Sequence, residues 1–265
     1  MREPVEVVEG DGPVVLGLPH TGTYVPTEVR VKLNALGRGL ADTDWNIHKL
    51  YDGLLPGATT VRATFHRYVI DANRDPSGAS LYPGQNTTGL VPLTDFEGNS
   101  IWGQAPSGGE VEYRREMFHA PYHAALEAQM KRVHAKHGVA VLYDCHSIRS
   151  RIEYLFEGVL PDFNIGTNDG VTCAPVIAEA VEGVCRDAEV YSSVSNGRFK
   201  GGWTTRHYGR PAEGWHAIQM ELAQSTYMEE VAPWPYLHDR ADRLRVHLKE
   251  ILAAIDAIAR NGELT

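Results

Sequence analysis

The sequence has few cysteines and no long apolar run. Its three cysteines, Cys145, Cys173 and Cys185, are an odd number at spacings that fit neither a disulfide framework nor a zinc ribbon. We interpret Cys173 and Cys185 as small buried hydrophobic side chains. No apolar stretch approaches the roughly twenty residues that span a bilayer, and the first residues, MREPVEVVEGDG, lack the apolar core of a signal peptide. We therefore expect a cytoplasmic protein with no membrane partner.

Basic clusters are also lacking. The formal charge is −9, and the 25 lysines and arginines are scattered among 34 acidic residues. This balance gives no electrostatic footprint for nucleic acid, and an acidic ligand would have to be held by a few local arginines. With 265 residues, of which 43% are hydrophobic, the chain can bury one sizeable core. We expect a single catalytic domain over residues 1–265, present as a monomer or a small homo-oligomer.

Several catalytic signatures are absent. The sequence contains no GxSxG elbow, no HExxH, no Walker A loop and no GxGxxG after a strand. A Ser/His/Asp triad that uses Ser147 or Ser225 remains a minor alternative, because neither serine stands in an elbow context.

Short apolar runs and amphipathic segments alternate along the chain. Unbroken runs of Val, Ile and Leu are typical of strands buried on both faces of a mainly parallel sheet. This alternation predicts an α/β fold, a three-layer sandwich with a mostly parallel central sheet. Two polar segments rich in Gly, Pro and Asn, Pro76–Gly109 and Pro161–Thr172, are predicted to be functional loops. The predicted strands are Val14–Leu18, Tyr68–Asp71, Val139–Asp144 and His216–Leu222, and the predicted helices are Tyr113–His137, which ends at Gly138, Cys173–Arg186 and Ala241–Arg260.

Polar residues follow the predicted strands, at the edge of the sheet where open α/β folds bind ligands. His20 comes just after the first strand, and an imidazole at such a turn is a candidate zinc ligand. Asp42 and Asp44 open a predicted helix, where an aspartate also serves as an N-cap. Both roles can hold together, with Asp42 as the cap and Asp44 bound to a metal.

Two further strands end in charged residues. Asp144 and His146 crowd onto the end of one strand with Arg149 and Arg151, and unpaired polar groups there would be unfavourable. We interpret His146 as the second metal ligand, and Asp144 as the acceptor of a hydrogen bond from a ligand imidazole.

Glu221 interrupts the last apolar strand. A buried carboxylate needs a partner or its pKa rises, and a glutamate with a raised pKa beside a metal suits general acid and base catalysis. Two histidines and a carboxylate leave zinc one position for water, which is the arrangement of a hydrolase.

Arginines stand near these clusters. Arg67 precedes the predicted strand that Asn73 and Arg74 follow, and a Gly-rich loop carries Arg198, Arg206 and Arg210. The planar guanidinium binds carboxylates in a bidentate manner, so arginines near a metal in an acidic protein favour a small acidic substrate. We assign Arg74 and Arg206 to substrate binding, and Arg198 and Arg210 to the surface.

Several strings of the sequence together resemble the N-formylglutamate amidohydrolase family. They occur in family order from about Pro19 to Met228, so the resemblance covers most of the chain. The strings are PHTGTYVP, DTDWNIHKLY, RYVIDANRDP, YDCHSIRSRI, LPDFNIGTNDG, NGRFKGGWTTRHYGRP and HAIQMELAQSTYM.

The resemblance implies a fold similar to the zinc carboxypeptidases and a catalytic site on the same plan. It implies hydrolysis of N-formyl-L-glutamate, a step of histidine degradation, with a divalent metal, zinc or alternatively cobalt. The HxxE spacing of carboxypeptidases is missing, since His20 is followed by Thr-Gly-Thr, and this leaves the choice between Asp42 and Asp44 open. The implied residues are His20, Asp44 and His146 as metal ligands, Glu221 as base, and Asn73 with Arg74 as a carboxylate clamp.

Two rival functions remain at this point. One is hydrolysis of another N-acyl amino acid or of the carboxyl end of a short peptide, and the other is non-catalytic binding of dicarboxylates. A pure binding protein has no need of Glu221 opposite two histidines, which favours an enzyme.

Overall fold

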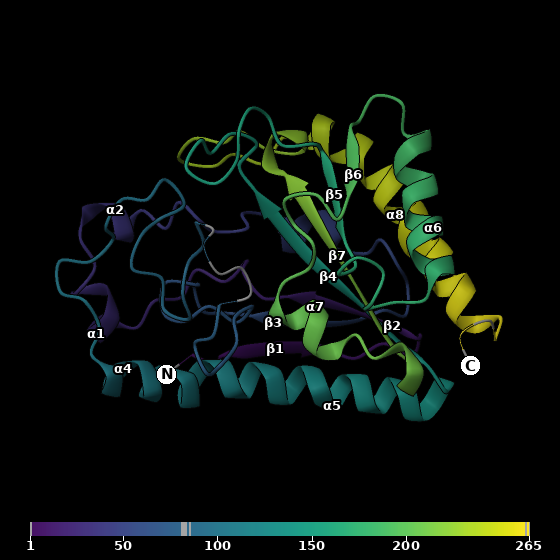
Figure 1. Cartoon of the computed structure of the whole chain (residues 1–265), viewed down its shortest axis with the longest axis horizontal. Coiled ribbons are helices and arrows are strands. Elements are labelled where there is room, and N and C mark those ends of the chain that lie inside the picture. Colours follow the sequence, from purple (N-terminus) through teal and green to yellow (C-terminus); the bar gives the residue numbers. More distant parts are fainter. Residues whose placement is uncertain (1, 81–83, 85, 263, 265) are drawn as a thin grey trace.

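A seven-stranded sheet forms the centre of the protein in the computed structural model, which describes residues 2–80, 84, 86–262 and 264. The strand order is β1-β3-β2-β4-β7-β5-β6, and only the β1–β3 and β5–β7 pairs are antiparallel. Helices cover both faces (Figure 1). The predicted mostly parallel α/β sandwich is therefore confirmed. The strands are β1 (Val5–Val8), β2 (Val14–Leu18), β3 (Thr59–Ala63), β4 (Ala140–Ile148), β5 (Phe163–Gly166), β6 (Ser193–Ser195) and β7 (Trp215–Ala223).

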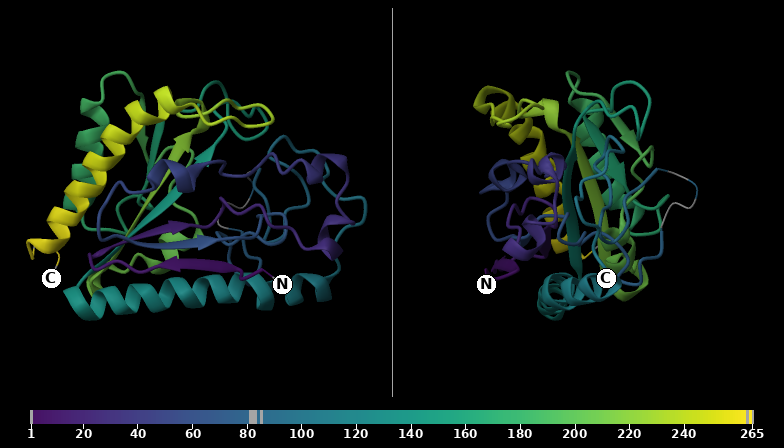
Figure 2. Two further views of the ribbon diagram at one scale, coloured as in Figure 1. Left: turned by 180° about the vertical axis from the view of Figure 1, so that it is seen from behind. Right: turned by 90° about the vertical axis from the view of Figure 1, so that its left-hand side faces the viewer.

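The helices divide between the two faces of the sheet. One face packs on α3, α6 and α8, and the other packs on the long α5, which runs alongside the sheet in Figure 1. Figure 2 shows α6 and α8 side by side at the end of the molecule away from the loops. The helices are α1 (Thr27–Arg30), α2 (Ala35–Arg38), α3 (Ile47–Tyr51), α4 (Gly108–Arg114), α5 (Ala120–His137), α6 (Pro175–Asp187), α7 (Trp203–Tyr208) and α8 (His238–Arg260), with a π-helical turn at Arg115–His119 and 3₁₀ turns at Pro211–Glu213 and Gln224–Thr226.

Alternation along the strands decides which residues reach which face. In β4, Val141 and Tyr143 pack toward α8, whereas Ala140 and Leu142 pack toward α5. Successive side chains of a strand point to opposite faces, so the next even-numbered residues of β4 lie on the α5 side. The same reasoning puts the odd-numbered residues of β7 on that side, since Ala217 packs there and Ile218 does not.

Most long elements agree with the sequence patterns. The predicted strands at 14–18, 139–144 and 216–222 correspond to β2, β4 and β7, and the three predicted helices correspond to α4 through α5, α6 and α8. Gly138 ends α5 in the left-handed conformation, with φ of 75°. All three cysteines are buried and unpaired, and Cys173 and Cys185 lie in the apolar core as predicted.

Two predicted elements are wrong. Tyr68–Asp71 is not a strand: Val69 N bonds His66 O in a turn, and Asp71 N bonds Leu90 O of a loop. The segment is apolar because it crosses the interior, since Val69 and Ile70 have no exposed surface. The predicted loop Pro161–Thr172 contains the short strand β5. Pro76–Gly109 is a loop over its described residues up to the start of α4.

Within the described residues, no helix combines the length and the apolar composition needed to cross a membrane.

Packing of α8 on the sheet yields a test of the fold. Leu248 is fully buried on α8, and its change to alanine is expected to lower the free energy of unfolding by about 2–5 kcal/mol through lost contacts and a cavity. Val246 lies on the same helix but is 53% exposed, so Val246→Ala should change the free energy by less than about 0.5 kcal/mol. Urea denaturation followed by circular dichroism measures both. Equal losses would mean that α8 does not pack through this face.

Candidate active site

Three side chains from distant segments meet at the carboxyl ends of the central strands. His20 follows β2, Asp44 lies in the turn before α3, and His146 is in β4. Each has a possible ligand atom within 4.8 Å of the others, and each residue is at most 2% exposed. Nδ1 of His20 lies 3.2 Å from Nδ1 of His146, and the Asp44 Oδ2 lies 3.9 and 3.4 Å from these two nitrogens.

These distances fit a tetrahedral metal ion. Ligands bound to zinc at about 2.0–2.2 Å in a tetrahedron lie roughly 3.2–3.6 Å from one another. The three observed distances, 3.2, 3.4 and 3.9 Å, lie close to this range without any rearrangement of the backbone. The donor set of two imidazoles and one carboxylate also suits zinc.

Each imidazole has a carboxylate behind it. Nε2 of His20 donates to Asp71 Oδ1 at 2.7 Å, and Nε2 of His146 lies 3.0 Å from Asp144 Oδ1. A carboxylate beside Nε2 keeps the proton on that nitrogen and leaves Nδ1 as the electron-pair donor. Two such lone pairs facing each other at 3.2 Å repel unless a proton or a metal ion lies between them. This group of side chains could therefore hold a cation.

In the absence of a metal ion, the pKa values of the two histidines are shifted in opposite directions. Burial, assisted by Arg67, lowers the pKa of His20 to about 4. Burial also opposes charge on His146, but the carboxylates of Asp144 and Asp44 outweigh it and raise the pKa of His146 well above its usual value. A proton on His146 thus relieves the repulsion, and a metal ion would displace that proton.

The guanidinium of Arg67 neutralises the buried carboxylates of Asp44 and Asp71. Its Nη2 donates to Asp44 Oδ1 at 2.7 Å, and its Nη1 lies 3.8 Å from Asp71 Oδ2. Burial alone would raise the pKa of Asp44, but the guanidinium of Arg67 and the two histidines hold it below the ordinary value. Asp44 is therefore a carboxylate, the form that binds a metal.

Glu221 lies next to this group. It is the direct register partner of His146 on the neighbouring parallel strand β7, and by alternation both point to the α5 side. Burial raises the pKa of Glu221 to about 8, against the lowering effect of His146. Its Oε2 accepts a hydrogen bond of 3.2 Å from Gln219 Nε2, and Gly202 N fixes the Gln219 amide by donating to Oε1 at 2.7 Å. Burial thus favours the protonated form of this carboxyl group, and the hydrogen bond from Gln219 fixes its position.

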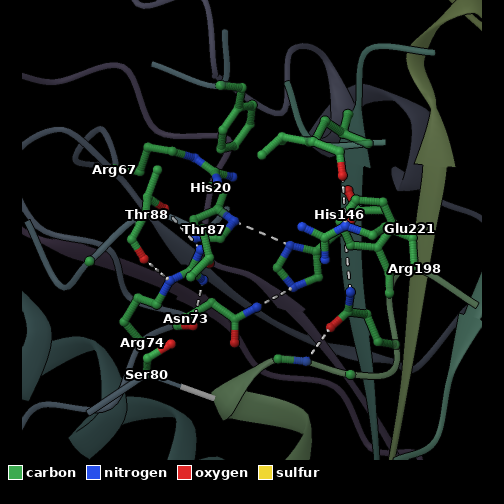
Figure 3. Close-up of a pocket in the computed structure, with 18 of the residues that line it drawn as sticks. His20, Arg67, Asn73, Arg74, Ser80, Thr87, Thr88, His146, Arg198 and Glu221 are labelled. Carbon is green, nitrogen blue, oxygen red and sulfur yellow. Dashed lines mark hydrogen bonds between the residues drawn. The ribbon is translucent and has the colours of Figure 1, made fainter. Parts of the chain in front are cut away.

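A pocket of about 210 Å³ opens above these residues. Figure 3 shows His20 and His146 on its inner wall, with Arg67 and Arg74 on one side and Glu221 and Arg198 on the other. Phe96, Leu155 and Phe199 add an apolar rim. An enclosed pocket with three arginines suits a small anionic ligand.

Asn73 and Arg74 both line the pocket. The Asn73 amide nitrogen lies 3.3 Å from His146 Nε2 (Figure 3). The Asn73 Oδ1 accepts from Thr204 N at 2.9 Å. Arg74 donates to the carbonyl and hydroxyl oxygens of Thr88 at 2.9 Å each. A Cβ on Gly202 would approach the Asn73 side chain to 2.3 Å, so any larger residue at that position would displace the Asn73 amide. Both side chains are thus held at the pocket wall.

The helix prediction near Asp42 needs correction. Helix α3 begins at Ile47, after Asn46 in the left-handed conformation with φ of 62°, so Asp42 is not its N-cap. The Asp42 carboxylate instead accepts from Tyr68 OH at 2.7 Å and from Phe96 N at 2.9 Å. Because these bonds direct Asp42 toward Tyr68 and Phe96, the structure brings Asp44, not Asp42, to the two histidines.

The arginines of the Gly-rich loop differ from their predicted places. Arg198, which we assigned to the surface, lines the pocket, and its Nε and Nη2 donate to Leu155 O and Asn86 O. Arg206 is not among the described residues that line the pocket. It lies on α7, and its Nε donates to Gly201 O. The loop turns at Gly201, which has φ of 105°, and such a turn cannot be read from residue spacing.

The pocket does not favour the serine alternative. Ser147 reaches the pocket wall, but its hydroxyl accepts from Tyr227 OH at 2.7 Å and from Gln224 Nε2 at 3.3 Å. Neither partner is a histidine that could act as its base.

Sequence reasoning gave no role to Asp71 or Gln219. Asp71 stood inside the apolar run that we took for a strand, although the string YVIDANR already places it two residues before Asn73. Gln219 lies two residues before Glu221, and the alternation of a strand is the signal that puts both on one face.

A mostly parallel α/β fold with a buried group of two imidazoles and a carboxylate, beside a further buried glutamate, defines a hydrolase-type site. The family model of N-formylglutamate amidohydrolases matches residues 12–228. The chain belongs to this family, whose members are amidohydrolases.

Two relatives carry the name N-formylglutamate deformylase. The protein of Pseudomonas putida is 48% identical over 250 residues, which is 93% of each chain. That of Pseudomonas aeruginosa is 45% identical over 264 residues, which is 98% of each chain.

Two solved structures share the fold. The N-formylglutamate amidohydrolase from Ralstonia eutropha superposes with a TM-score of 0.81 at 27% identity, covering 98% of this chain and 100% of that one. A gene product from Agrobacterium tumefaciens gives a TM-score of 0.75 at 19% identity, covering 97% and 96%, and shows the fold alone.

Removal of Arg67 tests the buried charges. Arg67→Met leaves Asp44 and Asp71 without their shared cation, and in the presence of a chelator the free energy of unfolding is expected to fall by about 3–5 kcal/mol. Lys200→Met breaks the exposed pair with Asp169 and should change it by less than about 1 kcal/mol. Urea denaturation measures both changes. A small effect at Arg67 would show that these carboxylates are neutral in the folded chain.

Proposed function

We propose that this chain hydrolyses N-formyl-L-glutamate to formate and L-glutamate. The observation that carries the proposal is the convergence of His20, Asp44 and His146 beside Glu221, at the base of a pocket with three arginines. Relatives named for this activity match nearly the whole chain, which supports the same substrate. We take residues 1–265 as one catalytic domain acting in histidine degradation, as a monomer or small homo-oligomer.

We assign a divalent metal ion, zinc rather than cobalt, to His20, Asp44 and His146. Both histidines would bind it through Nδ1, because their Nε2 atoms face Asp71 and Asp144. When bound, zinc supplies a Lewis acid that polarises a carbonyl and lowers the pKa of a water molecule to about 7. The three unpaired cysteines suit a reducing compartment, which supports a cytoplasmic location.

Glu221 acts as the general base in this proposal. Its carboxylate takes a proton from the attacking water, and the resulting acid passes the proton to the nitrogen of the leaving glutamate. A pKa raised by burial suits both steps, because the group can be charged in the first and protonated in the second. Gln219 keeps Oε2 oriented toward the pocket by its hydrogen bond of 3.2 Å.

Arginines hold the two carboxylates of the substrate. We assign one carboxylate to Asn73 and Arg74, and the other to Arg198, which lines the pocket where Arg206 does not. Arg67 lines the pocket near His20 and offers a fixed positive charge to the oxyanion that forms at the formyl carbon. Positioning by these groups supplies a large part of the rate.

Glu221→Gln tests the assignment of the base. The variant keeps the size of the side chain but cannot accept the proton, so kcat for formate release is expected to fall by about 10²–10⁴ with metal content unchanged. Glu213→Gln, a change on the exposed 3₁₀ turn before β7, is the control and should leave kcat unaltered. Formate is measured by coupling to formate dehydrogenase. Equal rates for Glu221→Gln and the parent would remove Glu221 from the mechanism.

Metal removal tests the ligand set. Dialysis against a chelator should abolish formate release, and added zinc or cobalt should restore it. Purified Asp44→Asn and His146→Ala should bind less than a tenth of the metal of the parent, and Asp71→Asn should weaken its affinity by about 10–100-fold through the His20 ring. Elemental analysis gives the stoichiometry. Full metal occupancy in His146→Ala would place the ion elsewhere.

A further inference from the structure

Side chains on one face of the helical segment formed by α4, the π turn and α5 contact the backbone around Asn73 and Arg74, the proposed carboxylate clamp. Nε2 of His123 lies 2.7 Å from the carbonyl oxygen of Ala72, and Nε2 of His119 lies 3.0 Å from that of Arg74. These are the carbonyls immediately before and after that of Asn73. A third contact joins Nη1 of Arg114 to Val69 O at 3.3 Å. The segment from Val69 to Arg74 is therefore held from the helix side by three side-chain donors.

A π-helical turn aligns these donors. Arg114 and His119 are five residues apart, and in a regular α-helix only residues three or four apart share a face. The π turn at Arg115–His119 has the longer i→i+5 repeat, which brings Arg114 onto the face of His119 and His123. Such turns occur often at functional sites. The π-helical turn thus directs three side chains toward one segment, Val69–Arg74.

The two histidines are suited to hold a carbonyl. Burial lowers the pKa of His123 to about 3 and also lowers the pKa of His119. Each ring is therefore neutral with one N–H, which the carbonyl oxygen accepts. Tyr208 OH lies 3.1 Å from Nδ1 of His123, where it can donate and so keep the ring proton on Nε2. The contacts fix the peptide group that precedes Asn73 and the peptide group that follows Arg74.

The pocket side of Asn73 is constrained as well. Its backbone N–H donates to Asp71 Oδ1 at 2.8 Å, and its side-chain oxygen accepts from Thr204 N. His119 and His123 thus constrain the backbone around Asn73 from the side opposite the pocket. Neither histidine is among the described residues that line the pocket.

We propose that His119 and His123 are positioning residues that set the geometry of the Asn73–Arg74 clamp and so determine how strongly the enzyme prefers a substrate with a free carboxylate. This inference rests on the proposed function, because it takes Asn73 and Arg74 as the group that binds a substrate carboxylate. The histidines touch neither substrate nor metal. They act through the Ala72 and Arg74 carbonyls.

The test compares N-formyl-L-glutamate with its two monoamides, in which either carboxylate is replaced by a carboxamide. In zinc-loaded His123→Leu, KM for N-formylglutamate should rise about tenfold while kcat changes less than about threefold. The preference over one monoamide, as a ratio of kcat/KM values, should fall about tenfold. His123→Gln keeps an N–H near the position of Nε2 and should restore most of this preference. His119→Leu and His119→Gln should behave in the same way.

His137→Leu is the matched control. His137 lies on the same helix and its Nε2 also contacts a backbone carbonyl, that of Asp11, at 2.8 Å, but this contact is at the far end of α5 from the pocket. Its loss should leave the preference for a free carboxylate unchanged. If the histidines merely stabilise the fold, both leucine variants at 119 and 123 will lower activity on all substrates alike. An unchanged preference in those variants would overturn the inference.

Equilibrium binding separates this inference from the proposed function. Calorimetry of L-glutamate and its two monoamides reports the same discrimination without any reaction. If the parent protein releases no formate from N-formylglutamate, the proposed reaction fails, yet a tenfold loss of discrimination in His123→Leu would still support the role of the histidines. If the parent is active and binding discrimination is equal in parent and variant, only the inference fails.

Discussion

The burial of several carboxylates at one end of the sheet is the constraint on which the site depends. Asp44, Asp71 and Asp144 are at most 1% exposed, and Glu221 is 7% exposed. Buried charges destabilise a fold unless each finds a partner, and isolated carboxylates in such places take up protons instead. Arg67 serves Asp44 and Asp71, and Nη1 of Arg74 lies 3.7 Å from Asp71 Oδ2. A cation held by His20, Asp44 and His146 would balance more of the remaining negative charge, and a divalent ion would do so better than a single proton.

The sheet brings the charges together through its register. Parallel pairing of β4 with β7 sets His146 opposite Glu221 and Asp144 opposite Gln219, and alternation turns these side chains to one face. On the α8 side the same strands supply apolar core residues up to their carboxyl ends, including Cys145, Met220 and Leu222, whereas on the α5 side the core residues end at Leu142 and Ala217. Stability and function are thus divided between the two faces at the carboxyl ends of these strands. The apolar part fixes the strand in place, and its rigidity holds the polar end to the distances that a metal ion requires.

Sequence patterns revealed the long elements because their burial is repetitive. β4 and β7 are buried throughout, and α8 shows apolar residues at helical spacing, so both could be predicted. The prediction of a strand at Tyr68–Asp71 was wrong for the same reason, since a turn that crosses the core is as apolar as a strand. The short strands β1 and β6 are mostly exposed and give little signal. Charged residues at strand ends pointed to the site, but the sequence did not predict the loop conformation by which Arg198, and not Arg206, is among the described residues that line the pocket.

Asp71 links the two halves of the site. Its Oδ1 accepts from His20 Nε2 at 2.7 Å and from Asn73 N at 2.8 Å, so a single oxygen aligns an imidazole of the proposed metal site and the start of the proposed carboxylate clamp. A shift of the segment around Asp71 would therefore disturb both positions together. The helix that carries His119 and His123 limits such a shift from the other side, through the carbonyls that flank Asn73. The placement of His20 relative to Asn73 and Arg74 consequently depends on this one segment, although His20 lies far from it in the chain.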